Sequence, residues 1–208
     1  MYKYIKNVWK KPKENLNELW KERLVSWRKQ PVSVRIEKPT RLDKARKLGY
    51  KAKPGYLIVR QRVIRGGHTR PTIRKGRKSK RRTNRQVVGK NYQQICEERA
   101  NKKHMNCEVL NSYYVAKEGR YIWYEVILVD KSHPVIKSDK KINWITEPQH
   151  RGRVFRGITS PARKSRGLRK KGKGAEKARP SLRANKRRMH WFFLYFLIFY
   201  SNFLIYFV

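Results

Sequence analysis

Arginine and glycine stand side by side at several points of this sequence, and the pairing suits the binding of phosphate groups. The planar guanidinium group of arginine can make two parallel hydrogen bonds to one phosphate. A neighbouring glycine lets the backbone approach the same phosphate closely. The pattern therefore indicates a surface that binds a polyanion through many separate contacts. Its instances are Arg65-Gly66-Gly67, Gly76-Arg77, Arg151-Gly152-Arg153 and Arg156-Gly157.

The basic residues are concentrated in two segments. Residues 60–90 contain 13 Lys or Arg and no acid, and residues 151–188 contain 16 against the single acid Glu176. Together the two segments hold 29 of the 55 Lys and Arg residues in the chain. The formal net charge is +41, and such a charge destabilises a compact domain by self-repulsion. We therefore expect a polyanionic partner, with nucleic acid favoured over an anionic membrane.

Structured RNA fits these two segments better than duplex DNA. The sequence has no spacing typical of a helix-turn-helix, a zinc finger or a basic zipper. Extended arginine-rich segments can follow the loops and bulges of folded RNA and become ordered as they bind. Ordering costs about 1–2 kcal/mol per residue for the backbone, so many phosphate contacts must offset it. The plainer alternative is a solvated, flexible charged surface.

Patterns for catalysis or metal binding are weak. The five histidines lie mainly in predicted loops or basic runs, outside any nucleophile or metal motif. Cys96, His104 and Cys107 lie close together, but their spacing matches no paired zinc motif and a fourth ligand is not evident. The N-terminus lacks an apolar signal segment, so we expect reduced thiols in the cytoplasm. We predict no enzyme, no cofactor and no metal, with zinc as the less favoured alternative.

A folded domain must position the basic segments, and hydrophobic periodicity indicates where it begins. Residues 13–30 predict an amphipathic helix, with apolar residues at three- and four-residue spacing. Residues 32–37 alternate between apolar and polar and predict a half-buried strand. Thr40 and Asp43 have the spacing of a capping box at the start of a short helix. Gly49 is placed to end that helix.

Further strands and a second long helix follow. Residues 56–65 predict a strand that starts apolar and becomes charged, and residues 91–104 predict a helix. Residues 108–130 predict a hairpin that turns at Lys117-Glu118-Gly119. A short helical turn is expected at HPVIKSD. The fold class is therefore α+β, with a small mixed sheet of about four strands, packed helices and long basic RNA-binding extensions.

These predictions divide the chain into four parts. Residues 1–31 form an N-terminal arm and helix, and residues 32–150 form the α+β core domain with the basic loop 60–90. Residues 151–188 form a basic, glycine-containing RNA-binding extension. This extension has no hydrophobic period, so we expect it to stand outside the core. Residues 189–208 form an atypical apolar tail.

The apolar tail admits two hypotheses. WFFLYFLIFYSNFLIYFV, residues 191–208, carries no charge. As a helix it would span about 27 Å, close to the roughly 30 Å of a bilayer core. A tail anchor beside the basic residues 186–188 is therefore one hypothesis. Most of its residue types can be encoded by A/T-rich codons, which favours the other, a read-through or out-of-frame extension. We favour the second and expect no membrane partner.

Long motifs spread over residues 1–188 resemble one family. They resemble large-subunit ribosomal protein fifteen of the archaeal and eukaryotic type, in an archaeal-like form. Pro161-Ala162 departs from the small, glycine-containing pair expected there, and nothing beyond residue 188 resembles the family. The motifs are YKYIKNVWKKPKE, RLDKARKLGYKAKPGYLIVRQRVIRGG, GRKSKR, EVLNSYYVAKEGRYIWYEVILVD, HPVIKSD, RGRVFRGITS and RGLRKKGKGAEKARPSLRANKRR.

This resemblance implies a structural constituent of the large ribosomal subunit that binds and bridges ribosomal RNA beside neighbouring ribosomal proteins. A free RNA chaperone is the alternative without a fixed site. Tyr2, Tyr4 and Trp9 are expected to pack on the domain rather than to stack on bases. The matched basic motifs imply RNA contacts from a set of cations. They are Arg35, Arg41, Arg46, Lys51, Lys53, Arg65, Arg74, Arg77, Lys78, Lys80, Arg81, Arg151, Arg153, Arg156, Arg163, Arg166 and Arg169.

Overall fold

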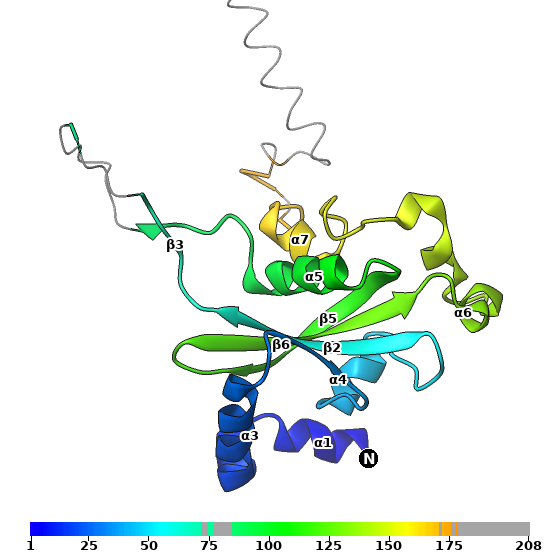
Figure 1. Cartoon of the computed structure of the whole chain (residues 1–208), viewed down its shortest axis with the longest axis horizontal. Helices are drawn as coiled ribbons and strands as arrows, with labels where there is room; N and C mark the ends of the chain where they lie inside the picture. The colour runs from blue at the N-terminus through cyan, green and yellow to red at the C-terminus, as the bar shows by residue number, and fades with distance from the viewer. Residues whose placement is uncertain (72–74, 77–84, 171, 176–177, 179–208) are drawn as a thin grey trace, which may run out of the picture.

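A four-stranded antiparallel sheet forms the centre of the molecule (Figure 1). The computed structural model describes residues 1–71, 75–76, 85–170, 172–175 and 178. The strands lie in the order β1-β2-β6-β5. Their bounds are β1 Ser33–Ile36, β2 Tyr56–Ile64, β5 Cys107–Lys117 and β6 Tyr121–Asp130.

The predicted α+β class and the number of strands in this sheet are confirmed, but the sheet is not mixed. All three strand pairings are antiparallel. A parallel pair needs a crossover connection, and none of these neighbours is joined in that way. β5 and β6 form a hairpin around the predicted turn, and the connection after β1 brings the chain back so that β2 runs in the opposite direction.

Helices cover both faces of the sheet (Figure 1). α1, α3 and α4 lie on one face, whereas α5 and α7 lie on the other. The short strands β3 and β4 pair at the base of the basic loop. The remaining short helices connect these elements. The bounds are α1 Tyr2–Val8, α2 Pro12–Asn15, α3 Asn17–Lys29, α4 Leu42–Lys47, β3 His68–Thr69, β4 Arg85–Gln86, α5 Tyr92–Lys103, α6 Pro134–Ser138, η1 Asn143–Thr146, η2 Pro148–His150 and α7 Ser160–Ser165.

Small apolar side chains fill the face of the sheet that α5 covers. Val59, Val126 and Leu128 are fully buried there against Cys96 and Ala100 of α5. Successive residues of a strand point to opposite faces, so the even-numbered positions of β6 form this layer. The small side chains allow α5 to lie close to the sheet, and burial of apolar area contributes roughly 25 cal/mol per Å².

Tryptophans fill the opposite face. Trp20 and Trp27 of α3 pack with their ring centroids 6.4 Å apart, and Trp27 lies 6.0 Å from Trp123 of β6. Trp9 lies edge-on to Trp20 at 5.7 Å. The expected packing of the aromatic N-terminus is therefore present for Trp9, whereas Tyr4 is exposed. Aromatic burial fixes α3 to the sheet despite its many charged residues.

Residues 151–170 pack on the domain, contrary to the prediction that this segment stands outside the core. Val154 is fully buried in the cluster under α5, and Pro161 and Ala162 are buried at the start of α7. The Asn91 side chain donates to the Pro161 carbonyl at 2.8 Å, and its backbone N–H donates to Ser165 Oγ at 3.1 Å. The prediction failed because these buried residues lie in turns and a short helix, without a long hydrophobic period.

The short helix α4 differs from its prediction at one end. It begins after Arg41 without a side-chain cap, so the capping box of Thr40 and Asp43 does not form. The Thr40 backbone N–H donates instead to Glu125 Oε2 at 3.1 Å. At the other end, Gly49 has a φ of +99° and follows the C-cap, as predicted. A buried carboxylate therefore anchors the chain that enters α4.

Candidate nucleic-acid interface

The cations implied to contact RNA differ in exposure. Arg74, Arg77, Lys78, Lys80 and Arg81 lie outside the described residues. Arg41, Lys53, Arg153 and Arg166 are partly buried. The exposed ones are Arg35, Arg46, Lys51, Arg65, Arg151, Arg156, Arg163 and Arg169.

One group of these cations lies around α4 and the loop that follows it. The ammonium groups of Lys51 and Lys53 both donate to Asp139 Oδ2, at 3.1 and 2.5 Å. The bond from Lys53 comes first among those that hold the pKa of Asp139 below its usual range, followed by bonds from the Lys141 backbone and Lys51. One carboxylate thus holds two lysines side by side and neutralises half of their charge. Arg46 of α4, which precedes these two lysines in the sequence, is also exposed.

A second exposed group lies on the α5 face, on the segment that ends in α7. The Gly152 N–H donates to Glu108 Oε1 at 2.9 Å, and Gly152 has a φ of +64° that favours glycine. Arg156 donates to the Gln149 carbonyl, and Arg169 donates to Ser160 Oγ. These contacts set the path of the backbone, so the outward-facing guanidinium groups are carried by a folded scaffold.

Other arginines of the implied set have internal partners. The Arg41 guanidinium lies 4.9 Å from the Trp9 ring centroid, and its Nη2 lies 3.5 Å from Asp43 Oδ2. Arg153 lies 4.6 Å from the Trp144 ring centroid. Burial lowers the pKa of Arg153. Contacts of this kind stabilise a cation against a ring face, so these arginines hold elements of the fold together.

Arg65 has a structural role as well as an exposed position. Its Nη1 donates to the carbonyls of Glu118 and Gly119, at 2.6 and 3.0 Å. Both carbonyls belong to the turn between β5 and β6. Arg65 therefore ties the end of β2 to that turn, and it marks the point where the chain leaves the sheet toward the basic loop.

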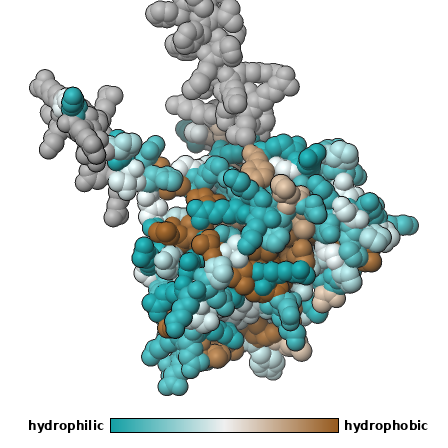
Figure 2. Space-filling view, in the orientation of Figure 1, coloured by the Kyte–Doolittle hydropathy of each residue, from teal (hydrophilic) through white to brown (hydrophobic). Residues whose placement is uncertain are grey.

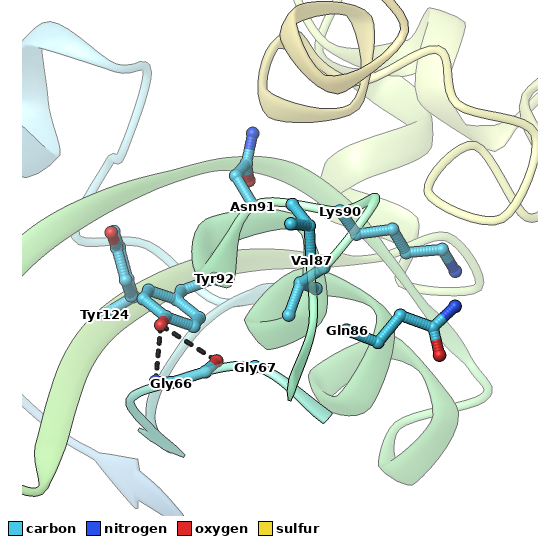
Figure 3. Close-up of a pocket in the computed structure, with 9 residues that line it drawn as sticks. Gly66, Gly67, Gln86, Val87, Lys90, Asn91, Tyr92 and Tyr124 are labelled. Atoms are coloured by element: carbon cyan, nitrogen blue, oxygen red, sulfur yellow. Dashed lines mark hydrogen bonds between the residues drawn. The ribbon is translucent and has the colours of Figure 1, made fainter. Parts of the chain in front are cut away.

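A pocket beside Tyr92 was not anticipated from the sequence. It has a volume of about 500 Å³ and is lined by Gly66, Gly67, Gln86, Val87, Val88, Lys90, Asn91, Tyr92 and Tyr124. Figure 3 shows the two tyrosines side by side, with the Tyr92 hydroxyl directed at Gly66. That hydroxyl accepts from the Gly66 N–H at 2.6 Å and donates to the Gly66 carbonyl at 3.1 Å. The tyrosines lie on different elements, so no local spacing in the sequence links them.

Two buried glutamates lie on opposite faces of the sheet. On the α5 face, Glu97 Oε1 accepts from Ser112 Oγ at 2.5 Å. On the other face, Glu125 Oε2 accepts from the Tyr113 hydroxyl at 2.5 Å, besides the Thr40 N–H. Desolvation is the largest cause that raises the pKa of both carboxyls. Each therefore belongs to a hydrogen-bonded network inside the domain.

The cysteines are buried, free thiols in the layer under α5. Burial raises the pKa of Cys107 to about 11 and raises that of Cys96 further. His104 follows the last residue of α5. Within the described ranges, no group of three or more His, Cys, Asp or Glu side chains is arranged to hold a metal ion. The two thiols therefore act as small core side chains.

Comparison with known proteins decides the family. The Ribosomal L15 family model (L15e) matches residues 1–185. The chain belongs to the ribosomal L15e family. It is 50% identical over 190 residues to the large ribosomal subunit protein eL15 of Methanospirillum hungatei, across 90% of this chain and 97% of that protein. The resemblance to large-subunit ribosomal protein fifteen of the archaeal and eukaryotic type is thus confirmed.

The L15e match leaves the apolar tail outside it. The matched residues end at 185, and residues 191–208 also lie outside the described residues. Both hypotheses for the tail therefore fall on a part of the chain about which the structure makes no statement. Among the residues that are described, no helix is both long and apolar enough to cross a bilayer.

Proposed function

We propose that this chain joins separate segments of ribosomal RNA as a structural constituent of the large ribosomal subunit. The ribosomal role and location follow from membership of the L15e family. The bridging role is the finer statement, and it is supported by where the exposed cations lie on the sheet domain. The expected partners are the large-subunit RNA and neighbouring ribosomal proteins.

One observation carries the bridging proposal: exposed cations occupy opposite faces of one sheet. Arg46 lies on α4, on the face covered by α1 and α3, whereas Arg163 lies on α7, beyond α5 (Figure 1). The sheet and its helices separate the two groups, so a single RNA duplex cannot easily contact both. In the space-filling view, hydrophilic side chains cover most of the visible face (Figure 2). A polar surface of this kind suits contact with RNA on more than one side.

The mechanism is electrostatic. Each guanidinium or ammonium group that binds a phosphate releases counterions, and the affinity falls as salt rises. Phosphate contacts position a protein on nucleic acid but carry no sequence information. Arg151 and Arg163 are held on a folded segment, so less conformational entropy is lost when they bind than for a free tail. The domain would then fix the relative position of the RNA segments on its two sides.

Crosslinking within intact particles tests the bridging role. Ribosomes are irradiated with ultraviolet light, and the attached peptides and nucleotides are identified by mass spectrometry and sequencing. We expect peptides containing Arg46 and peptides containing Arg163 to attach to RNA segments that are far apart in the RNA sequence and secondary structure. The fully buried residues 126–129 of β6 serve as the internal control and should yield no crosslink.

Two outcomes would contradict the proposal at different levels. If both peptides attach to one continuous RNA helix, the chain binds one segment and does not bridge. If the protein sediments free of large subunits in a sucrose gradient, the ribosomal assignment itself fails. Association that survives moderate salt and disappears after RNase treatment is the expected result.

A further inference from the structure

We propose that the pocket beside Tyr92 holds one unpaired nucleotide of the ribosomal RNA, with its base against the tyrosine side chains. The proposal deepens the proposed function and rests on it, because it requires that the chain binds RNA. It adds a base-binding site to a surface whose exposed lysines and arginines are expected to bind phosphates. None of the residues that line the pocket belongs to the set of RNA-contacting residues that the family motifs imply.

The shape of the pocket suits a single base. Its volume is about 500 Å³, which lies in the range of small-molecule sites. Tyr92 and Tyr124 lie side by side in it, and Val87 lies across from them, whereas Gln86 and Lys90 extend away (Figure 3). An aromatic and apolar lining with polar groups at its edge fits the flat face of a nucleobase.

Val87 presents an exposed apolar side chain at the mouth of this pocket. Its side chain is 93% exposed, although it stands beside two partly buried tyrosines. An apolar residue presented at the mouth of an aromatic pocket would be covered by a stacked or inserted base. Without such a ligand, the apolar surface of Val87 remains in contact with water.

The charge of the sequence segment that carries part of the pocket favours RNA as the occupant. Residues 60–90, which enclose Gly66, Gly67 and Val87, contain 13 Lys or Arg and no acid. The nearest acid to Lys90 is Glu98, whose carboxylate oxygens accept from Lys90 Nζ at 2.9 and 2.8 Å. That pair leaves the rest of the loop with its positive charge. A ligand with an aromatic part for the tyrosines and a phosphate for the cations is a nucleotide.

The floor of the pocket is fixed by backbone contacts. The two hydrogen bonds between the Tyr92 hydroxyl and Gly66 hold the chain at the start of the basic loop. A Cβ added at Gly67 would lie 2.5 Å from the Gln86 carbonyl oxygen, so only glycine permits the close approach of the two loop ends. The pocket is therefore formed before a ligand arrives, which lowers the entropy lost on binding.

The direct test places a photo-crosslinking amino acid at position 87 in the full-length chain. Because Val87 is exposed, the replacement should leave the fold of the chain unchanged, and its entry into large subunits is checked by sedimentation. After irradiation of purified particles, we expect a crosslink to a single nucleotide in an unpaired region of the large-subunit RNA. A crosslink to a ribosomal protein, or crosslinks spread over many nucleotides, would overturn the proposal.

A pair of variants at Tyr92 tests the role of the ring. Tyr92→Phe keeps the aromatic ring and removes both hydrogen bonds to Gly66, whereas Tyr92→Leu removes the ring as well. Loss of one base–aromatic contact should raise the reactivity of the bound base toward a base-selective chemical probe by roughly tenfold. We expect that rise in particles with Tyr92→Leu and not in those with Tyr92→Phe. Equal reactivity in both variants and the parent chain would refute base stacking.

The failure of this proposal can be told apart from failure of the proposed function. If the parent chain does not enter large subunits, RNA binding itself is wrong. If the chain enters them and its Arg46 and Arg163 peptides crosslink to RNA, but position 87 does not, only the pocket assignment is wrong. Val87→Ser offers a further variant on the exposed side of the pocket, in case Tyr92→Leu lowers incorporation.

Discussion

Two neighbours in β5, Ser112 and Tyr113, point to opposite faces of the sheet, and each donates a hydrogen bond to a buried glutamate. Ser112 binds Glu97 of α5, and Tyr113 binds Glu125 of β6. The surroundings of the two carboxylates differ in kind. On one face they are small apolar residues and a helix, whereas on the other they are mainly tryptophans and a tyrosine.

A comparison of the two faces shows what decides the role of an arginine. On the tryptophan face, Arg60 lies 4.4 Å from the Trp27 ring centroid and donates to Gln30 Oε1 at 2.7 Å. Burial lowers the pKa of Arg60, and Glu125 opposes that effect. On the α5 face, Arg151 and Arg163 point outward from the segment that covers the helix. Arg60, which is buried against a ring, holds the fold together, whereas the exposed Arg151 and Arg163 remain available to a phosphate.

The largest effect should come from breaking the tryptophan face. Trp27→Ala removes a ring that packs against Trp20, Trp123 and Arg60. We expect the free energy of unfolding to fall by about 3–5 kcal/mol, measured by denaturant unfolding of the isolated chain at high ionic strength. Leu19→Ala on the same helix is the control, because Leu19 is 45% exposed; its change should stay within about 0.5 kcal/mol. Equal losses for both variants would contradict the packing described for this face.

The next effect concerns the two hydroxyl donors on β5. Ser112→Ala and Tyr113→Phe each leave a buried carboxylate oxygen without its hydroxyl donor, and each should cost about 1–3 kcal/mol of stability. Because the side chains face opposite sides of the sheet and share no partner, the double variant should show the sum of the two losses within about 0.5 kcal/mol. A coupling energy above that limit would mean that the sheet does not separate the two networks.

The titration of the glutamates offers a smaller and more specific contrast. Desolvation raises the pKa of Glu97 and Glu125, so the folded chain binds protons that the unfolded chain releases above a pH of about 4.3. The free energy of unfolding should therefore fall as the pH rises from that value through the folded-state pKa. Glu97→Gln and Glu125→Gln do not titrate at that position.

Each glutamine variant should thus gain stability relative to the parent chain as the pH rises through this window. Denaturant unfolding at a series of pH values measures the difference. A gap that stays constant over the window, or that moves in favour of the parent chain at higher pH, would show that the carboxyls are not destabilised by burial.

The sequence predicted the sheet well because its strands carry strong local signals. β6 alternates between the layers of the two faces, and a short turn joins it to its hairpin partner β5. The segment that includes Val154 and Ala162 was missed, since a few buried residues in turns give no period. The direction in which strands pair was also missed, because periodicity specifies which face a residue occupies and not which strand lies beside it.

The candidate interface was predictable only in part for the same reason. Charge clusters and motifs of the L15e type indicate a polyanion partner without showing which cations are free. Arg41 lies 32 positions from Trp9 in the chain, so their contact depends on how α1 packs against α4. The pocket residues Tyr92 of α5 and Tyr124 of β6 likewise come together only in the folded domain. Sequence patterns describe composition along the chain, whereas availability to a ligand is decided by tertiary contacts.

The smallest expected effect compares an internal with an outward arginine. Arg151→Gln removes an exposed cation and should reduce the slope of log affinity for large-subunit RNA against log salt by roughly one unit. Arg41→Gln removes a guanidinium group that already contacts Trp9 and Asp43, so the slope should stay unchanged while the unfolding temperature falls. Both quantities are measured on the same two proteins, by titration of RNA at several salt concentrations and by thermal unfolding. A slope lowered equally by the two changes would mean that Arg41 leaves its ring to bind phosphate, and that tertiary contacts do not decide which arginines are available.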